Sequence, residues 1–190
     1  MRLFVALDID LAIRAELESF VRNLKSQVPD VRFVGPETYH VTLKFLGETT
    51  KLEAIHKQLR TVQAPQFQVS FRGTGFFPSA QRPRVFWAGI EAGPELAALA
   101  ERIDAALGPL GFAREKGPYH PHLTLSRKGS GNPHSRHAPG NSGFHRVQQI
   151  LSSTQPPDFG TMTAREFFLY ESRLSPSGAS YAKLERFELG

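Results

Sequence analysis

The chain has 190 residues, a net charge of +5 and no cysteine; 40% of its residues are hydrophobic and 22% are charged. This length suits one domain or two small fused lobes, and the composition is that of a folded globular protein. The missing cysteine excludes a disulfide scaffold, a cysteine-ligated zinc site and a cysteine nucleophile.

The positive charge favours anionic partners, nucleic acid among them, although a soluble protein without such a partner also carries a charge of this size. No apolar run approaches the ~20 residues that are needed to span a bilayer. The N-terminal segment reaches Asp8 too early to contain the apolar core of a signal peptide. We therefore expect a cytoplasmic protein that has no membrane partner. We also expect a monomer.

Hydrophobic periodicity predicts a series of strands and helices along the chain. Asp10 is a candidate N-cap for the first helix, and Pro29 ends it. Residues 128–143 carry no periodic apolar residue and are rich in Gly, Ser, Asn, Pro and His, which predicts a mobile loop. In chain order we expect a strand at 2–9, a helix at 11–26, a strand at 39–46, a helix at 51–62, strands at 67–72 and 84–90, a helix at 94–107, a strand at 119–127, a helix at 144–152, and strands at 164–171 and 180–188 joined by a turn at 175–178.

The chain matches itself at an offset of 82 residues, and both copies contain a strand, a helix, Gly-Pro and then a strand that bears His-x-Thr-Leu. We therefore expect a single domain over residues 1–190 with two pseudo-symmetric lobes, whose motifs at 40–43 and 122–125 face each other. The matched pairs are Arg2 and Arg84, Phe4 and Phe86, Ala6 and Ala88, Gly35-Pro36 and Gly117-Pro118, His40 and His122, Thr42 and Thr124, and Leu43 and Leu125.

Each His-x-Thr motif places its two polar side chains on one face of a strand, because residues i and i+2 of a strand share a face. In the first motif His40 and Thr42 share one face, while Val41 and Leu43 point into a core. The second motif repeats this arrangement. Opposed lobes then form a cleft that contains two imidazoles and two hydroxyls.

Two imidazoles in one cleft are suited to general acid–base catalysis, since a pKa near 6.5 lets one ring be neutral while the other is protonated. The neutral ring takes a proton from water, and the protonated ring gives one to a leaving oxygen. The threonine hydroxyls donate hydrogen bonds to oxygens on which charge develops. This set suits displacement at a phosphodiester without a metal, in particular at a strained cyclic diester.

Two alternatives stay open at this point. His120 and His122 form a His-x-His pair, which is a spacing found in metal sites. No Asp or Glu stands in an obvious matching strand position, and the repeat pairs His120 with Thr38 rather than with a histidine. Each His-x-Thr motif, taken singly, is also typical of an ordinary half-buried strand.

Four segments resemble the two-histidine (2H) phosphoesterases: RLFVALDI at 2–9, HVTLKFLGE at 40–48, HPHLTLSR at 120–127 and SRLSPSGASYAKL at 172–184. The similarity is greatest to their bacterial and archaeal RNA 2′,3′-cyclic phosphodiesterases, also called 2′-5′ RNA ligase-like proteins. It implies a bilobal, duplicated α+β fold with antiparallel sheets lining a central groove and helices on the outside. It also implies hydrolysis without metal or cofactor, which converts 2′,3′-cyclic phosphate ends of RNA or tRNA fragments, or cyclic nucleotides, to 2′-phosphomonoesters.

The resemblance also implies a role for each motif residue. By position, His40 matches the proton donor to the leaving oxygen, His122 matches the proton acceptor that activates water, and Thr42 and Thr124 match phosphate-binding hydroxyls. A ligase that joins tRNA halves through a 2′-5′ bond uses the same residues. A non-catalytic RNA-binding module is a third possible function. Further candidate substrate contacts are Lys44, Arg127, Phe77 and Tyr119.

The sequence pattern leaves two placements open for several of these side chains. Lys44 shares a face with His40 by alternation, so it either approaches a phosphate or is a solvated lysine near the strand end. Alternation places Arg127 on the opposite face, so it reaches the cleft only if the strand bends. The rings of Phe76, Phe77 and Tyr119 either stack on a base or pack in the core. His56 is expected on a helix surface, and His134 and His137 are expected in the loop.

Overall fold

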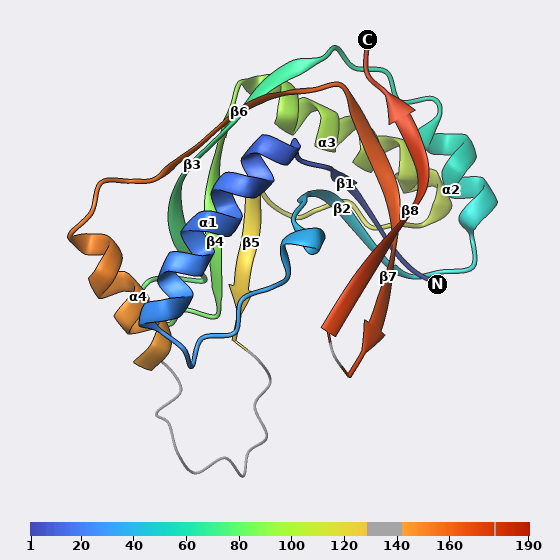
Figure 1. Ribbon diagram of the computed structural model, residues 1–190. Coiled ribbons are helices and arrows are strands. Elements are labelled where there is room, and N and C mark those ends of the chain that lie inside the picture. Colours follow the sequence, from blue (N-terminus) through green and yellow to red (C-terminus); the bar gives the residue numbers. More distant parts are fainter. Residues whose placement is uncertain (129–141, 177) are drawn as a thin grey trace.

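The computed structural model describes residues 1–128, 142–176 and 178–190 (Figure 1). The strands of this part of the chain are β1 (Arg2–Leu7), β2 (Val41–Glu48), β3 (Phe67–Phe77), β4 (Val85–Ala92), β5 (His122–Arg127), β6 (Asp158–Ala164), β7 (Glu166–Ser175) and β8 (Gly178–Glu188). The helices are α1 (Leu11–Gln27), α2 (Leu52–Leu59), α3 (Pro94–Leu107) and α4 (Ser142–Ser152), with short 3₁₀ turns at Pro36–Thr38 and Gly108–Leu110.

The described strands form two antiparallel four-stranded sheets, with the orders β2-β1-β7-β8 and β5-β4-β3-β6. The α+β class and the antiparallel sheets are thus confirmed. The strands β2 and β5, which carry the two motifs, are both edge strands, and they contact each other. Helix α1 follows β1 but packs against β6, and α3 follows β4 but packs against β2, so each helix contacts the sheet that lacks its preceding strand. Figure 1 shows the β7–β8 hairpin and α4 at opposite sides of the molecule.

The ladders β1–β2 and β4–β5 have the same irregularity. Thr42 lies opposite Ala6, and Thr124 lies opposite Trp87. Immediately after these pairs, both ladders shift register, so that one leucine in each motif strand, Leu43 or Leu125, forms a bulge. The strands β2 and β5 therefore correspond at the offset of 82.

The strands β1 and β4, in contrast, correspond at one residue less, so the expected matches Arg2–Arg84, Phe4–Phe86 and Ala6–Ala88 are wrong by one position. A slip of one residue turns every side chain of a strand to the other face. Accordingly, Phe86 lies in the main core, whereas Phe4 belongs to a separate cluster with Phe168 and Tyr170.

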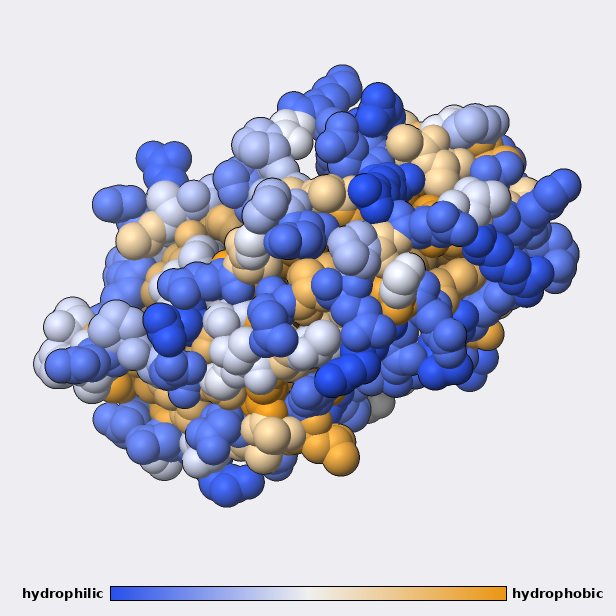
Figure 2. Space-filling view, turned by 90° about the horizontal axis from the view of Figure 1, so that it is seen from above, coloured by the Kyte–Doolittle hydropathy of each residue, from blue (hydrophilic) through white to orange (hydrophobic). Residues whose placement is uncertain are grey.

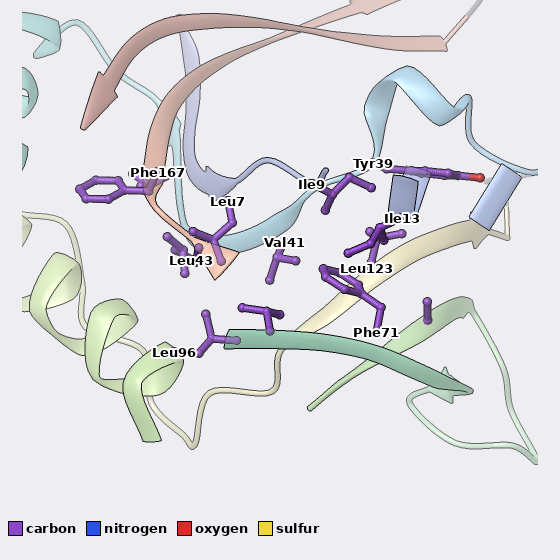
Figure 3. Packing of buried hydrophobic residues seen from close by; sticks show 14 of the residues in the cluster. Leu7, Ile9, Ile13, Tyr39, Val41, Leu43, Phe71, Leu96, Leu123 and Phe167 are labelled. Atoms are coloured by element: carbon purple, nitrogen blue, oxygen red, sulfur yellow. The ribbon is translucent and has the colours of Figure 1, made fainter. Parts of the chain in front are cut away.

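A single main core lies between the sheets and the helices. The inward positions of both motifs, Val41, Leu43, Leu123 and Leu125, are 0–4% exposed, as the alternation predicted. Figure 3 shows residues from β1, β2, β3, β5, β7 and α3 packed in this one cluster. The outer surface in Figure 2 is mostly hydrophilic, with small hydrophobic patches between polar side chains. The inward side chains of both motif strands thus belong to the same core.

The predicted elements agree with the structure except at the places named here. The second motif strand begins at His122 rather than at residue 119, and the strand expected at 67–72 extends to Phe77. The first motif strand begins at Val41 rather than at residue 39, because Pro36–Thr38 forms a 3₁₀ turn. Asp10 occupies the N-cap of α1, but its side chain makes no capping hydrogen bond. Strand β6 was not expected: it follows two prolines and contains Gly160 at φ 109°, both of which are typical of turns. Residues 129–141 of the expected loop, with His134 and His137, lie outside the described residues.

None of the helices in the three described ranges is long and apolar enough to cross a membrane.

Candidate active site

His40 immediately precedes β2, and both of its ring nitrogens have partners. Nδ1 donates to the backbone carbonyl of Thr38 at 2.7 Å, because a carbonyl oxygen can only accept. Nε2 lies 3.0 Å from the hydroxyl oxygen of Thr42. The hydrogen bond at Nδ1 therefore fixes the tautomer and leaves Nε2 as the nitrogen that gains or loses a proton.

The ring of His40 lies in an aromatic pocket. The ring centroid of Phe4 is 4.9 Å away, and Tyr181 meets the imidazole edge-on at 5.1 Å. The pKa of His40 is lowered to about 4, mainly by burial. The nearby charges of Arg127 and His122 act in the same direction, whereas the backbone hydrogen bond to Thr38 acts against it. The sequence reasoning missed Phe4 and Tyr181 as neighbours of His40. The available signal was that Tyr181 lies in the SRLSPSGASYAKL segment of the resemblance.

His122 is the first residue of β5, and it is held in a matching way. Nδ1 donates to the carbonyl of His120 at 2.9 Å, so Nε2 is again the titrating nitrogen. Phe77 meets the ring edge-to-face at 4.8 Å. Burial is the main cause that lowers the pKa of His122, and the charge of Arg127 acts in the same direction. Both imidazoles are thus biased toward the neutral form by burial and by one shared guanidinium.

Arg127 reaches the motif face because of the bulge at Leu125. The bulge restores Arg127 to the face of Thr124, since their partners Val85 and Trp87 are two residues apart in β4. The guanidinium donates to the hydroxyl oxygen of Thr124 at 3.3 Å. Strict alternation predicts this side chain on the opposite face unless the strand bends. The bulge at Leu125 is such a bend.

The matching bulge at Leu43 has the opposite consequence for Lys44. Lys44 lies opposite Val5, a core residue, and it is only 3% exposed. Its ammonium group pairs with Asp104 on α3 and donates to the carbonyl of Ala113 at 2.8 Å. The expectation that Lys44 shares the face of His40 is therefore wrong, because the bulge interrupts the alternation on which it depends.

Three further side chains considered in the sequence analysis have partners outside the two motif side-chain pairs. The hydroxyl of Tyr119 donates to the backbone carbonyl of Thr42 at 2.7 Å. Phe76 packs on Phe86 in the core, with ring centroids 4.9 Å apart. His56 is not a surface residue as expected: its side chain is 14% exposed and pairs with Glu185 at 2.6 Å.

A groove of about 920 Å³ opens beside the two motifs. It runs along the outer edge of β2, between α3 and residues 114–120, and its wall includes Thr42, Tyr119 and His122. Among the described residues, no group of three or more His, Asp or Glu side chains is placed to hold a metal ion. The groups that the structure brings together are two imidazoles, two threonine hydroxyls and one guanidinium.

The profile of the 2′-5′ RNA ligase superfamily matches residues 10–171, and the chain belongs to this superfamily. The RNA 2′,3′-cyclic phosphodiesterase of Archaeoglobus fulgidus is 38% identical over 190 residues, which cover 99% of this chain and 100% of that protein. The RNA 2′,3′-cyclic phosphodiesterase of Thermus thermophilus is 34% identical, over 100% of this chain and 90% of that protein.

Solved structures agree with this assignment. The protein TT0787 of Thermus thermophilus has a TM-score of 0.77 and 28% identity, over 99% of this chain and 97% of that one. E. coli LigT in complex with 3′-AMP has a TM-score of 0.75 and 26% identity, over 99% and 97% of the two chains. The resemblance to the 2H phosphoesterases is thereby confirmed.

Proposed function

We propose that this enzyme hydrolyses the 2′,3′-cyclic phosphate end of RNA, or a 2′,3′-cyclic nucleotide, to a 2′-phosphomonoester. The observation that carries this proposal is the pair of imidazoles on adjoining edge strands, each with Nδ1 bound to a backbone carbonyl and Nε2 left to exchange a proton. Close relatives that share the whole chain are named for this activity.

The reaction is an in-line displacement at phosphorus. Nε2 of His122 accepts a proton from water as the water oxygen bonds to phosphorus. The bond from phosphorus to the ribose 3′ oxygen breaks, and Nε2 of His40 gives its proton to that oxygen. The products are a 2′-phosphate and a free 3′-hydroxyl, and each proton transfer contributes about 10²–10⁴-fold.

The other groups of the site bind the phosphate. The hydroxyls of Thr42 and Thr124 donate to its non-bridging oxygens, and Arg127 supplies positive charge beside Thr124. Phe77 borders the imidazole of His122 and Tyr119 lines the groove, which supports contacts of their rings with the sugar or the base next to the phosphate. The anionic phosphate also favours the protonated form of His40, which burial alone disfavours.

Two related functions remain as alternatives. The description of the superfamily names a 2′-5′ RNA ligase, in which an RNA 5′-hydroxyl from a second tRNA half replaces water. A non-catalytic RNA-binding module is disfavoured, because phosphate binding alone requires Lys and Arg rather than two aligned imidazoles. We also propose that the protein is monomeric and cytoplasmic. In this proposal, residues 1–190 form a single domain that consists of two pseudo-symmetric lobes.

The test is incubation of the purified protein with a 2′,3′-cyclic nucleotide in excess EDTA, with the product identified by chromatography. We expect complete conversion to the 2′-phosphate at a rate that EDTA does not change. A His40→Ala/His122→Ala double variant is the control for contaminating nucleases. Loss of activity in EDTA with recovery on addition of Zn²⁺ or Mn²⁺ would support a metal site at His120 and His122 instead.

A further inference from the structure

The segment that leads into the second motif is tied to the first motif strand at both ends. Near its start, the carbonyl of Ala113 accepts a hydrogen bond from Lys44 at 2.8 Å. Near its end, the hydroxyl of Tyr119 donates to the backbone carbonyl of Thr42 at 2.7 Å. β2 is the outermost strand of its sheet, so Tyr119 supplies a donor where a neighbouring strand is missing.

Tyr119 is held in place while it makes this bond. Its ring is half-buried and packs against the main core. Burial raises the pKa of its hydroxyl well above the usual value, so the group remains a donor across the pH range in which the protein is studied. His122 follows three residues later, so a single hydrogen bond joins the approach to the second motif with the threonine of the first.

The second motif strand is held to the segment before the first motif by different groups. The amide of Val34 donates to the carbonyl of Leu125 at 2.9 Å, and the hydroxyl of Ser126 donates to the carbonyl of Arg32 at 2.5 Å. The bond at Leu125 is between backbone groups, and the bond of Ser126 does not involve Thr124. A substitution of Tyr119 therefore removes a hydrogen bond at Thr42 and leaves the hydrogen bonds of Leu125 and Ser126 in place.

We propose that Tyr119 is a positioning residue for proton donation. By holding the carbonyl of Thr42, it keeps the Thr42 hydroxyl 3.0 Å from Nε2 of His40 and so directs this histidine at the leaving oxygen. This inference depends on the proposed function, in which His40 is the acid. A displacement of about 1 Å in such a group costs up to about 10²-fold in rate.

The test compares two substrates with Tyr119→Phe, which keeps the ring and removes the hydroxyl. With a 2′,3′-cyclic nucleotide we expect kcat to fall by about tenfold while KM changes by less than about twofold. With a phosphodiester whose leaving group is nitrophenolate, we expect a loss below about threefold, because that group departs without a proton. The ratio of the two losses is the readout, since a partly unfolded sample lowers both rates equally.

Ser126→Ala is the matched control, because it removes a hydrogen bond between the same two halves without touching Thr42. Any loss it causes should be equal for both substrates, and Tyr119→Leu should reproduce the ratio found for Tyr119→Phe. Equal losses of Tyr119→Phe on both substrates, or an unchanged kcat, would overturn the role assigned to Tyr119. Failure of the wild-type protein on the cyclic nucleotide would instead refute the proposed function.

Discussion

Nε2 of His40 lies 3.0 Å from the hydroxyl oxygen of Thr42, whereas Nε2 of His122 has no hydrogen-bond partner among the described residues. In the second motif, Thr124 accepts from Arg127 instead. The two motifs have the same sequence pattern, yet one imidazole is engaged by its own threonine and the other is open to an incoming molecule. This difference agrees with His122 as the group that activates water.

Removal of either imidazole should abolish turnover. We expect His40→Ala and His122→Ala each to retain less than about a hundredth of the wild-type kcat, because each loses one proton transfer worth about 10²–10⁴-fold. The measurement is steady-state hydrolysis of a 2′,3′-cyclic nucleotide. His145→Ala, an exposed histidine on α4, is the control that should match wild type. Activity above about a tenth of wild type in either motif variant would contradict the assignment.

The acid and the base can be told apart by the leaving group. With a nitrophenolate ester, His40→Ala should recover much of its lost rate, because this leaving group needs no proton. His122→Ala should not recover, because the water still lacks its base. Measured rates on both substrates for both variants decide the matter: recovery of His122→Ala alone would reverse the two roles.

The pH profile follows from the direction of the two pKa shifts. Burial lowers the pKa of His40 to about 4 and lowers that of His122 from its usual 6.5. The active form needs His40 protonated and His122 neutral, so kcat/KM should be bell-shaped with its maximum below pH 6.5. Its limbs belong to the coupled pair. As pH rises, His40 loses its proton; as pH falls, His122 gains one.

The profile of kcat provides the check on this reasoning. A bound phosphate anion raises the pKa of both rings, so the bell for kcat should lie at higher pH than the bell for kcat/KM. Both profiles come from initial rates between about pH 4 and about pH 9, which brackets the ordinary histidine pKa. A kcat/KM that still increases from about pH 7 to about pH 8 would show that the free enzyme does not hold both rings at lowered pKa values.

Lys44 should support folding rather than substrate binding. Among the described residues, Lys44→Met leaves Asp104, whose side chain is 13% exposed, with Arg114 at 3.5 Å as its remaining ion-pair partner. We expect the free energy of unfolding to fall by about 3 kcal/mol, the cost of breaking a buried pair, while KM changes by less than about twofold. Urea denaturation and initial rates measure the two effects. Lys116→Met, at an exposed position, is the control and should change stability by less than about 0.5 kcal/mol. A large rise in KM at unchanged stability would restore a role for Lys44 in binding.

Much of the fold was predictable, because local periodicity reflects which face of an element is buried. The helices α1 and α3 and the inward positions Val41 and Leu123 follow from this rule. Strand β6 was not predicted, because Gly160 and the preceding prolines are local signals of a turn. The strand is formed by pairing with β3, which is a long-range contact. His56 was expected to be solvated for a similar reason: its partner Glu185 is distant in the sequence.

The sequence by itself determined the repeated His-x-Thr motifs, the pairing of each histidine with a threonine on one strand face, and membership in a family with a known chemistry. Only the tertiary structure decided which further side chains join the motifs. The bulges at Leu43 and Leu125 turn Lys44 into the core and Arg127 onto the motif face, although both residues follow their motifs closely. A bulge is set by the register of the neighbouring strand, and that register results from packing between segments far apart in the chain, which alternation within one strand does not record.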